Sequence, residues 1–119
     1  MDFAFSMLGD NGMADVIQVI EDVKKYDKDA DESLITGIFR ELGAVVYNRN
    51  TRYIDCTDPF DRMQLREHFL KKKLGLQLND DALNEAIDKT CIIMKDANPR
   101  LRATFCYLLV KRFSKEALF

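Results

Sequence analysis

Apolar residues recur at helical spacing along this chain, and this periodicity constrains the possible fold more than any other feature. One set comprises Leu83, Ala86, Ile87, Thr90, Cys91 and Met94, and a second comprises Leu101, Thr104, Phe105, Leu108, Leu109 and Phe113. Steps of three and one residues place each set on one face of an α-helix. The sequence therefore predicts an all-α fold, a compact single-domain bundle of about five helices. Because residues 105–110 are apolar nearly all round, we expect the last long helix at its centre.

Composition and length are those of one globular domain. The chain has 119 residues, 47% of them hydrophobic and 32% charged, with a formal net charge of −2. We expect a helical domain over residues 13–119, preceded by an arm of residues 1–12 that is either loose or docked; translation starting at Met7 or Met13 is the alternative. No apolar run approaches the ~18–20 residues of a membrane span.

Local signals place the helices at residues 13–26, 32–47, 59–74, 80–95 and 99–113. The first helix should bury Val16, Ile17, Ile20 and Val23. Asp29 or Asp31 can cap the second helix, whose Gly37 and Gly43 would allow a neighbouring helix to approach closely.

Other signals mark the ends of the later elements. Asp58 and Pro59 form a helix start, and Gly75 is a natural stop. Residues 79–81 supply an acidic cap, and Pro99 suits the first position of the last helix. Residues 48–57 are irregular, and a short strand over residues 53–56 is one alternative there.

Three cysteines, Cys56, Cys91 and Cys106, cannot all pair within one chain. None belongs to a C-x-x-C motif, and Cys91 and Cys106 lie in apolar helical stripes. The sequence therefore favours buried, reduced thiols and a reducing cytoplasm.

Two motifs suggest chemistry but lack the necessary partners. Asp27, Asp29 and Asp31 have the spacing of the first calcium ligands of an EF-hand, but Glu32 and Ile38 stand where that loop needs glycine and a bidentate glutamate. A helix-capping cluster is favoured instead. His68 is the only imidazole, and nothing in the sequence supplies a nucleophile or an orienting partner. We therefore predict no catalytic residue, no metal site and no cofactor.

Basic residues concentrate in the lysine run Lys71, Lys72 and Lys73. Five more basic side chains follow near the last helix: Arg100, Arg102, Lys111, Arg112 and Lys115. Several cations on one face could bind phosphates, but a solvated helix end explains them as well.

Three stretches resemble a known family: residues 46–58 (VYNRNTRYIDCTD), 69–76 (FLKKKLGL) and 107–119 (YLLVKRFSKEALF). The chain resembles, from Val16 to Phe119, a small bacterial family catalogued as domain of unknown function 2853, although Ser114 stands where the family pattern has glycine. The resemblance implies a small cytoplasmic bacterial helical protein without an assigned activity. It adds Tyr47 and Asn48 to the basic residues as a candidate interaction surface.

The function expected from these observations is a non-enzymatic cytoplasmic interaction module that binds a protein partner or itself. Weak nucleic-acid binding through the lysine run is the alternative. An enzyme that uses Tyr47, Asn48, Arg52 and Asp55 is a third hypothesis, which a deep polar pocket between that segment and the basic helix would favour and a filled surface would not.

Overall fold

The structure is a computed structural model, and it describes residues 15–119; the predicted arm of residues 1–12 lies outside the described residues. After a first helix, described over residues 15–24, the elements are α2 (Glu32–Leu42), η1 (Gly43–Val46), β1 (Tyr53–Ile54), α3 (Pro59–Gln64), η2 (Leu65–Lys73), α4 (Asp80–Ile93), β2 (Arg100–Leu101), α5 (Arg102–Arg112) and η3 (Glu116–Leu118). The all-α class predicted from periodicity is confirmed, with one two-stranded sheet as its only β-structure in the described part.

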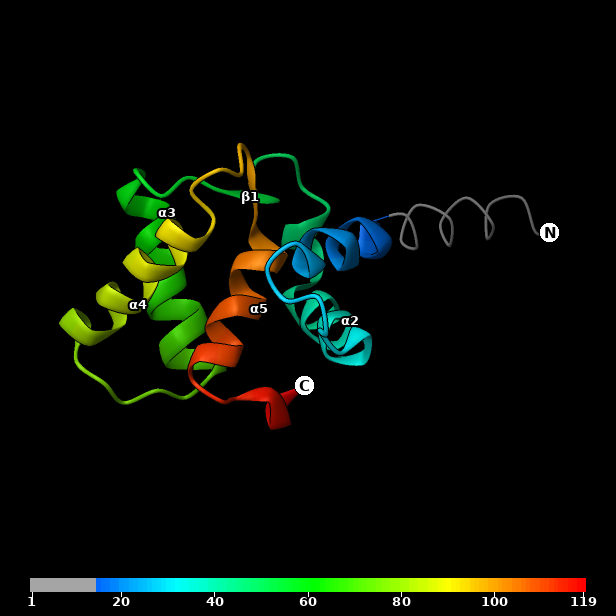
Figure 1. The fold of residues 1–119 in the computed structure, drawn as a ribbon. Helices are drawn as coiled ribbons and strands as arrows, with labels where there is room; N and C mark the ends of the chain where they lie inside the picture. Colours follow the sequence, from blue (N-terminus) through cyan, green and yellow to red (C-terminus); the bar gives the residue numbers. More distant parts are fainter. Residues whose placement is uncertain (1–14) are drawn as a thin grey trace.

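Helix α5 runs through the middle of the molecule, as its apolar sequence predicts (Figure 1). It contacts α2 on one side and α4 on the other, and α4 also packs on η2. Phe105, Leu109 and Val110 on this helix are completely buried. A helix with such a sequence is stable in water only when other helices cover it on most sides.

Helix capping follows the sequence closely. Asp31 accepts a hydrogen bond from the Ser33 N–H, so the second of the two predicted caps is the one used. Asp58 caps α3 through the N–H of Phe60, and Asn79 caps α4 through the N–H of Ala82. Each cap satisfies a backbone donor that the first helical turn leaves unpaired.

The two glycines of the second predicted helix have different roles. Helix α2 ends at Leu42, before a 3₁₀ turn, because Gly43 has a φ of +65° that ends the helix. The close approach predicted there is wrong, since a Cβ on Gly43 would meet no atom within 4 Å. At Gly37 a close approach is real, but the neighbour is the C-terminal residue rather than a helix: a Cβ would lie 3.3 Å from the Cβ of Phe119.

Two further predictions about side chains and helix ends are corrected. Ile17 is 47% exposed, and the buried residues on that helix are Val19 and the predicted Val23. The last helix begins at Arg102 rather than Pro99, because Arg100 and Leu101 form β2. This strand pairs antiparallel with β1, with Tyr53 opposite Leu101. The possible strand at residues 53–56 is thus shortened to two residues.

The third predicted helix has the expected extent but not the expected geometry. From Leu65 to Lys73 it is a π-helix, which ends before Gly75 at a φ of +68°. π-helical turns are rare and are frequently found at functional sites.

Candidate functional site

A hollow of about 830 Å³ lies beside the two-stranded sheet; we call it the polar pocket. Its walls are Val45, Asn50, Thr51, Tyr53, Ile54, Asp55, Asp58, Phe60, Asp61, Gln64, Asn98, Pro99, Arg100 and Arg102. These residues come from the irregular segment after η1, the start of α3 and the turn before α5. The pocket therefore lies beside the segment for which the third hypothesis required one.

One backbone hydrogen bond and three from side chains to backbone carbonyls hold the irregular segment in place. The Arg102 N–H donates to the Arg52 carbonyl at 2.8 Å, and Arg102 Nε donates to the Thr51 carbonyl at 2.5 Å. Thr51 Oγ1 donates to the Val45 carbonyl at 2.7 Å, and Arg52 Nε to that of Val46 at 2.9 Å. A loop fixed in this way can present binding groups with little ordering cost.

Three aspartates line the pocket, and each also has a local structural bond. Asp61 Oδ2 accepts from the Asp55 N–H at 2.9 Å, and its Oδ1 from Arg102 Nη2 at 3.4 Å. Asp58 Oδ1 accepts from the Phe60 N–H at 2.9 Å. The aspartates are thus fixed in position, and their remaining oxygen lone pairs can still accept hydrogen bonds from a ligand.

Asp55 is held in its ionised form. The Thr57 hydroxyl, which donates to Asp55 Oδ1 at 2.6 Å, lowers the pKa of this carboxyl most; the Thr57 N–H and the charge of Arg100 lower it further. Hydrogen bonds to a carboxylate favour its charged form. An acid or base catalyst at neutral pH needs a pKa shifted in the opposite direction. This side chain is therefore suited to binding.

Two arginines complete the charge pattern of the pocket. Arg100 Nε donates to the Met94 carbonyl at 3.1 Å, whereas its Nη groups make no hydrogen bond to another described residue. The Arg102 side chain is only 10% exposed, and Asp61 is its ion-pair partner. Both Nη groups of Arg100 are thus left for an anionic group, whereas Arg102 has only its Nη1 left.

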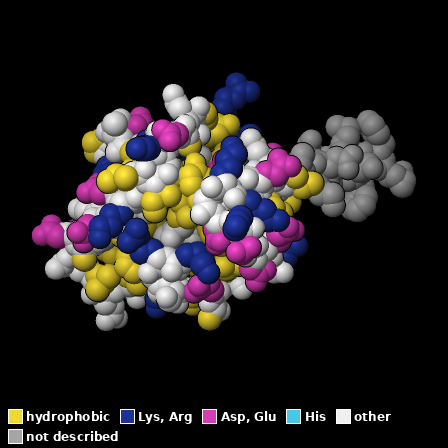
Figure 2. All heavy atoms as spheres, in the orientation of Figure 1, with side chains coloured by type: hydrophobic (Ala, Val, Ile, Leu, Met, Phe, Trp, Pro, Cys, Tyr) yellow, Lys and Arg dark blue, Asp and Glu magenta, His cyan; other side chains and the backbone are white. Residues whose placement is uncertain are grey.

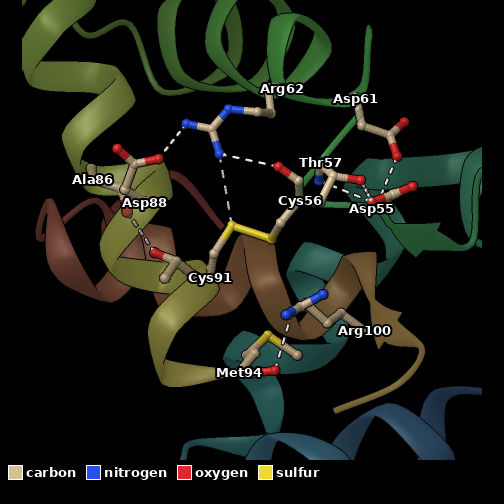
Figure 3. Close-up of a disulfide and its surroundings, with 11 residues drawn as sticks. Asp55, Cys56, Thr57, Asp61, Arg62, Ala86, Asp88, Cys91, Met94 and Arg100 are labelled. Atoms are coloured by element: carbon tan, nitrogen blue, oxygen red, sulfur yellow. Dashed lines mark hydrogen bonds and ion pairs between the residues drawn. A yellow bond between two sulfur atoms is a disulfide. The ribbon is translucent and has the colours of Figure 1, made fainter. Parts of the chain in front are cut away.

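Behind the pocket wall, Cys56 and Cys91 form a disulfide, so the prediction that both thiols are reduced is wrong. The bond joins the loop after β1 to α4 across 35 residues. Arg62 points at this junction and donates to the Cys56 carbonyl, while it also contacts Cys91 Sγ and pairs with Asp88 (Figure 3). Cys106 is free and buried, as predicted. Sequence spacing could not reveal the pair, because the fold alone brings the two segments together.

Tyr47 and Asn48 of the predicted surface lie outside the polar pocket. The Tyr47 ring is half exposed and packs edge-on against Phe39, with ring centres 5.6 Å apart. Asn48 Oδ1 accepts from the Asn50 N–H at 2.8 Å. Arg52 pairs with Asp15 at 3.9 Å. Of the four residues in the enzyme hypothesis, only Asp55 lines the pocket.

Much of the predicted basic surface is engaged in ion pairs. Lys71 pairs with Asp80 at 2.8 Å and Glu67 at 3.0 Å, and Lys73 pairs with Glu41 at 3.0 Å. Lys111 pairs with Glu116 at 3.3 Å. Lys72, Arg112 and Lys115 have no ion-pair partner among the described residues. On the face shown in Figure 2, positive and negative side chains alternate.

The acidic cluster around Asp27 and Asp31 makes structural hydrogen bonds, and the single histidine lies on the surface. Asp27 Oδ2 accepts from the buried Tyr107 hydroxyl at 2.6 Å, and Asp31 caps α2. His68 is exposed on η2. Over residues 15–119, no three His, Cys, Asp or Glu side chains come close enough together to hold a metal ion.

Asp58 and Asp61 line the pocket, although the sequence predicted only a helix start at Asp58 and no role for Asp61. Their spacing at the start of a helix has the same appearance whether or not a cavity lies beside it. The pairing of β1 with β2 was the missing signal, because it brings Arg100 to the loop that carries Asp55.

None of the described helices is long and apolar enough to cross a lipid bilayer. No curated protein matches the chain. The family described as "protein of unknown function (DUF2853)" matches residues 18–117. This match covers every element from α2 to α5, the two-stranded sheet included, and every residue of the polar pocket, and the chain therefore belongs to the DUF2853 family.

Proposed function

We propose that this protein is a non-catalytic interaction module that binds a protein partner through the polar pocket. The observation that carries the proposal is the composition of the pocket, where carboxylates of Asp55 and Asp58 accompany the guanidinium of Arg100. Such a surface can accept donors from a cationic group and donate to a neighbouring anionic one. Peptide segments with both charges meet these requirements.

An exposed aromatic residue at the pocket supports a protein as the ligand. Phe60 follows Pro59 in the first turn of α3, and it is 60% exposed although it is large and apolar. Aromatic residues are enriched at the centres of protein interfaces, where polar groups surround them. Phe60 beside the aspartates gives this combination.

The fixed ionisation of Asp55 supports binding rather than acid–base catalysis. Its pKa is lowered by Thr57, so the group stays charged near neutral pH and cannot readily return a proton. A stable negative charge is instead useful for recognition of a cationic side chain.

Affinity capture with the full chain as bait tests this proposal. Phe60→Ala should lose the captured partner, because it removes the exposed anchor while leaving the core unchanged. Leu78→Ala is the matched control, since Leu78 is a 46% exposed apolar residue outside the pocket. Equal capture by both variants and the parent protein would contradict the proposal.

Sedimentation distinguishes a second copy of this chain from another protein. If the partner is the chain itself, a concentration-dependent dimer should form and weaken in Phe60→Ala. If it is a different protein, the chain should sediment as a 13.8 kDa monomer and form a complex only with the captured partner.

We also propose a bacterial cytoplasmic location, which the family resemblance implies. Fractionation of the native bacterium tests this location: the protein should be recovered with cytoplasmic marker enzymes, and recovery with the periplasmic fraction would contradict it. The Cys56–Cys91 disulfide makes the test informative, because structural disulfides are rare in the cytoplasm and common in the periplasm.

A further inference from the structure

A second hollow, of about 140 Å³, lies where η1 and the end of α2 meet the π-helix η2; we call it the apolar pocket. Leu42, Val45, Leu65 and Phe69 form most of its wall. The Cys106 thiol also lines it and is buried, and burial raises the pKa of this thiol to about 12, so it remains neutral. An enclosed apolar cavity of about 150 Å³ holds one benzene ring, so this open hollow has room for one ring with its polar end toward the solvent.

Every ionisable side chain on this wall other than the thiol is basic. These residues are His68, Lys73 and Arg102, and no carboxylate lines the pocket. This distribution contrasts with the polar pocket, which has three aspartates and two arginines. An apolar chamber with only basic groups favours a ligand with an apolar body and a negative charge.

The positions of the basic groups indicate where that charge would lie. Lys73 is 40% exposed and His68 is exposed, so both are at the solvent side. Lys73 Nζ donates to the Glu41 carboxylate at 3.0 Å and to the Glu41 carbonyl at 3.1 Å, which leaves one of its three N–H donors. Arg102 is deeper, and its Nη1 makes no hydrogen bond to another described residue.

The backbone geometry also supports a ligand site at the apolar pocket. Leu65, His68, Phe69 and Lys73 all belong to the π-helix, so the irregular segment of this helix and the apolar pocket coincide. The π-helix is rare among helices, and it is frequently found at functional sites.

We propose that the apolar pocket binds a small apolar monocarboxylate about the size of a six-membered ring acid. Its body would lie against Leu65 and Phe69, and its carboxylate would accept hydrogen bonds from Lys73 and His68. Val45, Gln64 and Arg102 line both pockets, but Lys73 and His68 line only the apolar one. The inference therefore does not rest on the proposed partner at the polar pocket.

Benzoate is the probe, and the single histidine of the chain is the reporter. Titration of the full protein, followed by the NMR signals of the His68 ring, should give saturable shifts together with those of Phe69. The amides of Tyr53 and Asp55 in the polar pocket should not shift. Benzamide, which has the same shape without the charge, should bind more weakly.

Matched variants identify the group that recognises the carboxylate. Lys73→Met should weaken benzoate binding about tenfold, the value of one charge-assisted hydrogen bond, and should leave benzamide binding unchanged. Lys72→Met removes a neighbouring charge outside the pocket and should have no effect. Glu41→Gln breaks the same ion pair as Lys73→Met but keeps the ammonium, so it should retain or improve the affinity.

Any of three results would overturn the inference. The first is the absence of His68 shifts with benzoate up to about 20 mM, a concentration well above the millimolar affinity of a weak small-molecule site. The second is equal affinity for benzoate and benzamide, and the third is an equal loss of benzoate affinity in Lys72→Met and Lys73→Met. None of these results depends on whether the polar pocket binds a partner.

Discussion

Ser114 is a single residue whose backbone conformation carries a free-energy cost. Its φ is +55°, and it follows α5 in a hydrogen-bonded helix stop: the Ser114 N–H donates to Lys111, and the Lys115 N–H donates to Val110. This pattern usually has glycine at the residue with positive φ. The family resemblance places glycine at this position, and the structure supplies the physical reason.

Ser114→Gly should therefore stabilise the protein by about 0.5–1 kcal/mol, because the relief of left-handed strain exceeds the added freedom of the unfolded chain. Urea denaturation measures the difference. Ser33→Gly is the control, since Ser33 lies in the first turn of α2, where glycine should lower stability. A destabilised Ser114→Gly variant would contradict the strain argument.

Cys106 should make stability depend on alkaline pH. Its pKa is 9.0 when unperturbed and about 12 in the folded protein, because burial disfavours the thiolate. The folded pKa is raised, so the stabilisation is complete below pH 9 and is lost as the pH rises toward 12. At pH 10 the loss should be about 1.4 kcal/mol.

The measurement compares the parent protein with Cys106→Val in urea at several pH values. Valine keeps the apolar packing but does not titrate, so the parent should lose stability relative to the variant above pH 9. Tyr107, whose pKa is also raised by burial, affects both proteins equally. Parallel stability curves from pH 7 to about pH 10.5 would exclude Cys106 as the cause.

At the scale of elements, the disulfide connects the loop after β1 with α4. It closes a loop of 35 residues, and the chain-entropy estimate for this length is about 3–4 kcal/mol of stabilisation. Replacement of both Cys56 and Cys91 by serine should lower the free energy of unfolding by about this amount. Denaturation of the parent with and without a thiol reductant gives the matched comparison. An unchanged midpoint would show that the crosslink contributes nothing.

How well the elements could be predicted depended on whether their signals are local. The caps at Asp31, Asp58 and Asn79 need only nearby backbone donors, and the glycine stop at Gly75 needs only its own φ, so these positions were predictable. The strands, the disulfide and the polar pocket depend on contacts between segments about 35 to 50 residues apart, such as the hydrogen bond from Arg102 to Thr51. A sequence pattern carries no direct record of such contacts.

At the scale of the whole molecule, the arrangement of charges decides how much of the basic sequence is available. Lys71 lowers the pKa of Asp80, and Arg66 together with Lys71 lowers that of Glu67, so both carboxylates stay ionised beside the lysine. Lys73 and Lys111 have their own carboxylates. With a net charge of −2, the chain has little field to attract a polyanion.

We therefore expect the protein to bind a generic oligonucleotide more weakly than about 10⁻⁴ M even at low salt, where phosphate contacts are strongest. Fluorescence anisotropy measures this affinity. The triple variant Glu41→Gln, Glu67→Gln and Asp80→Asn keeps every lysine but removes their carboxylate partners, so its affinity should increase and fall steeply with added salt. The opposite result would be tight, salt-sensitive binding by the parent that is lost when Lys71, Lys72 and Lys73 are changed to glutamate. That result would establish nucleic-acid binding, because it would mean that phosphates displace the paired carboxylates.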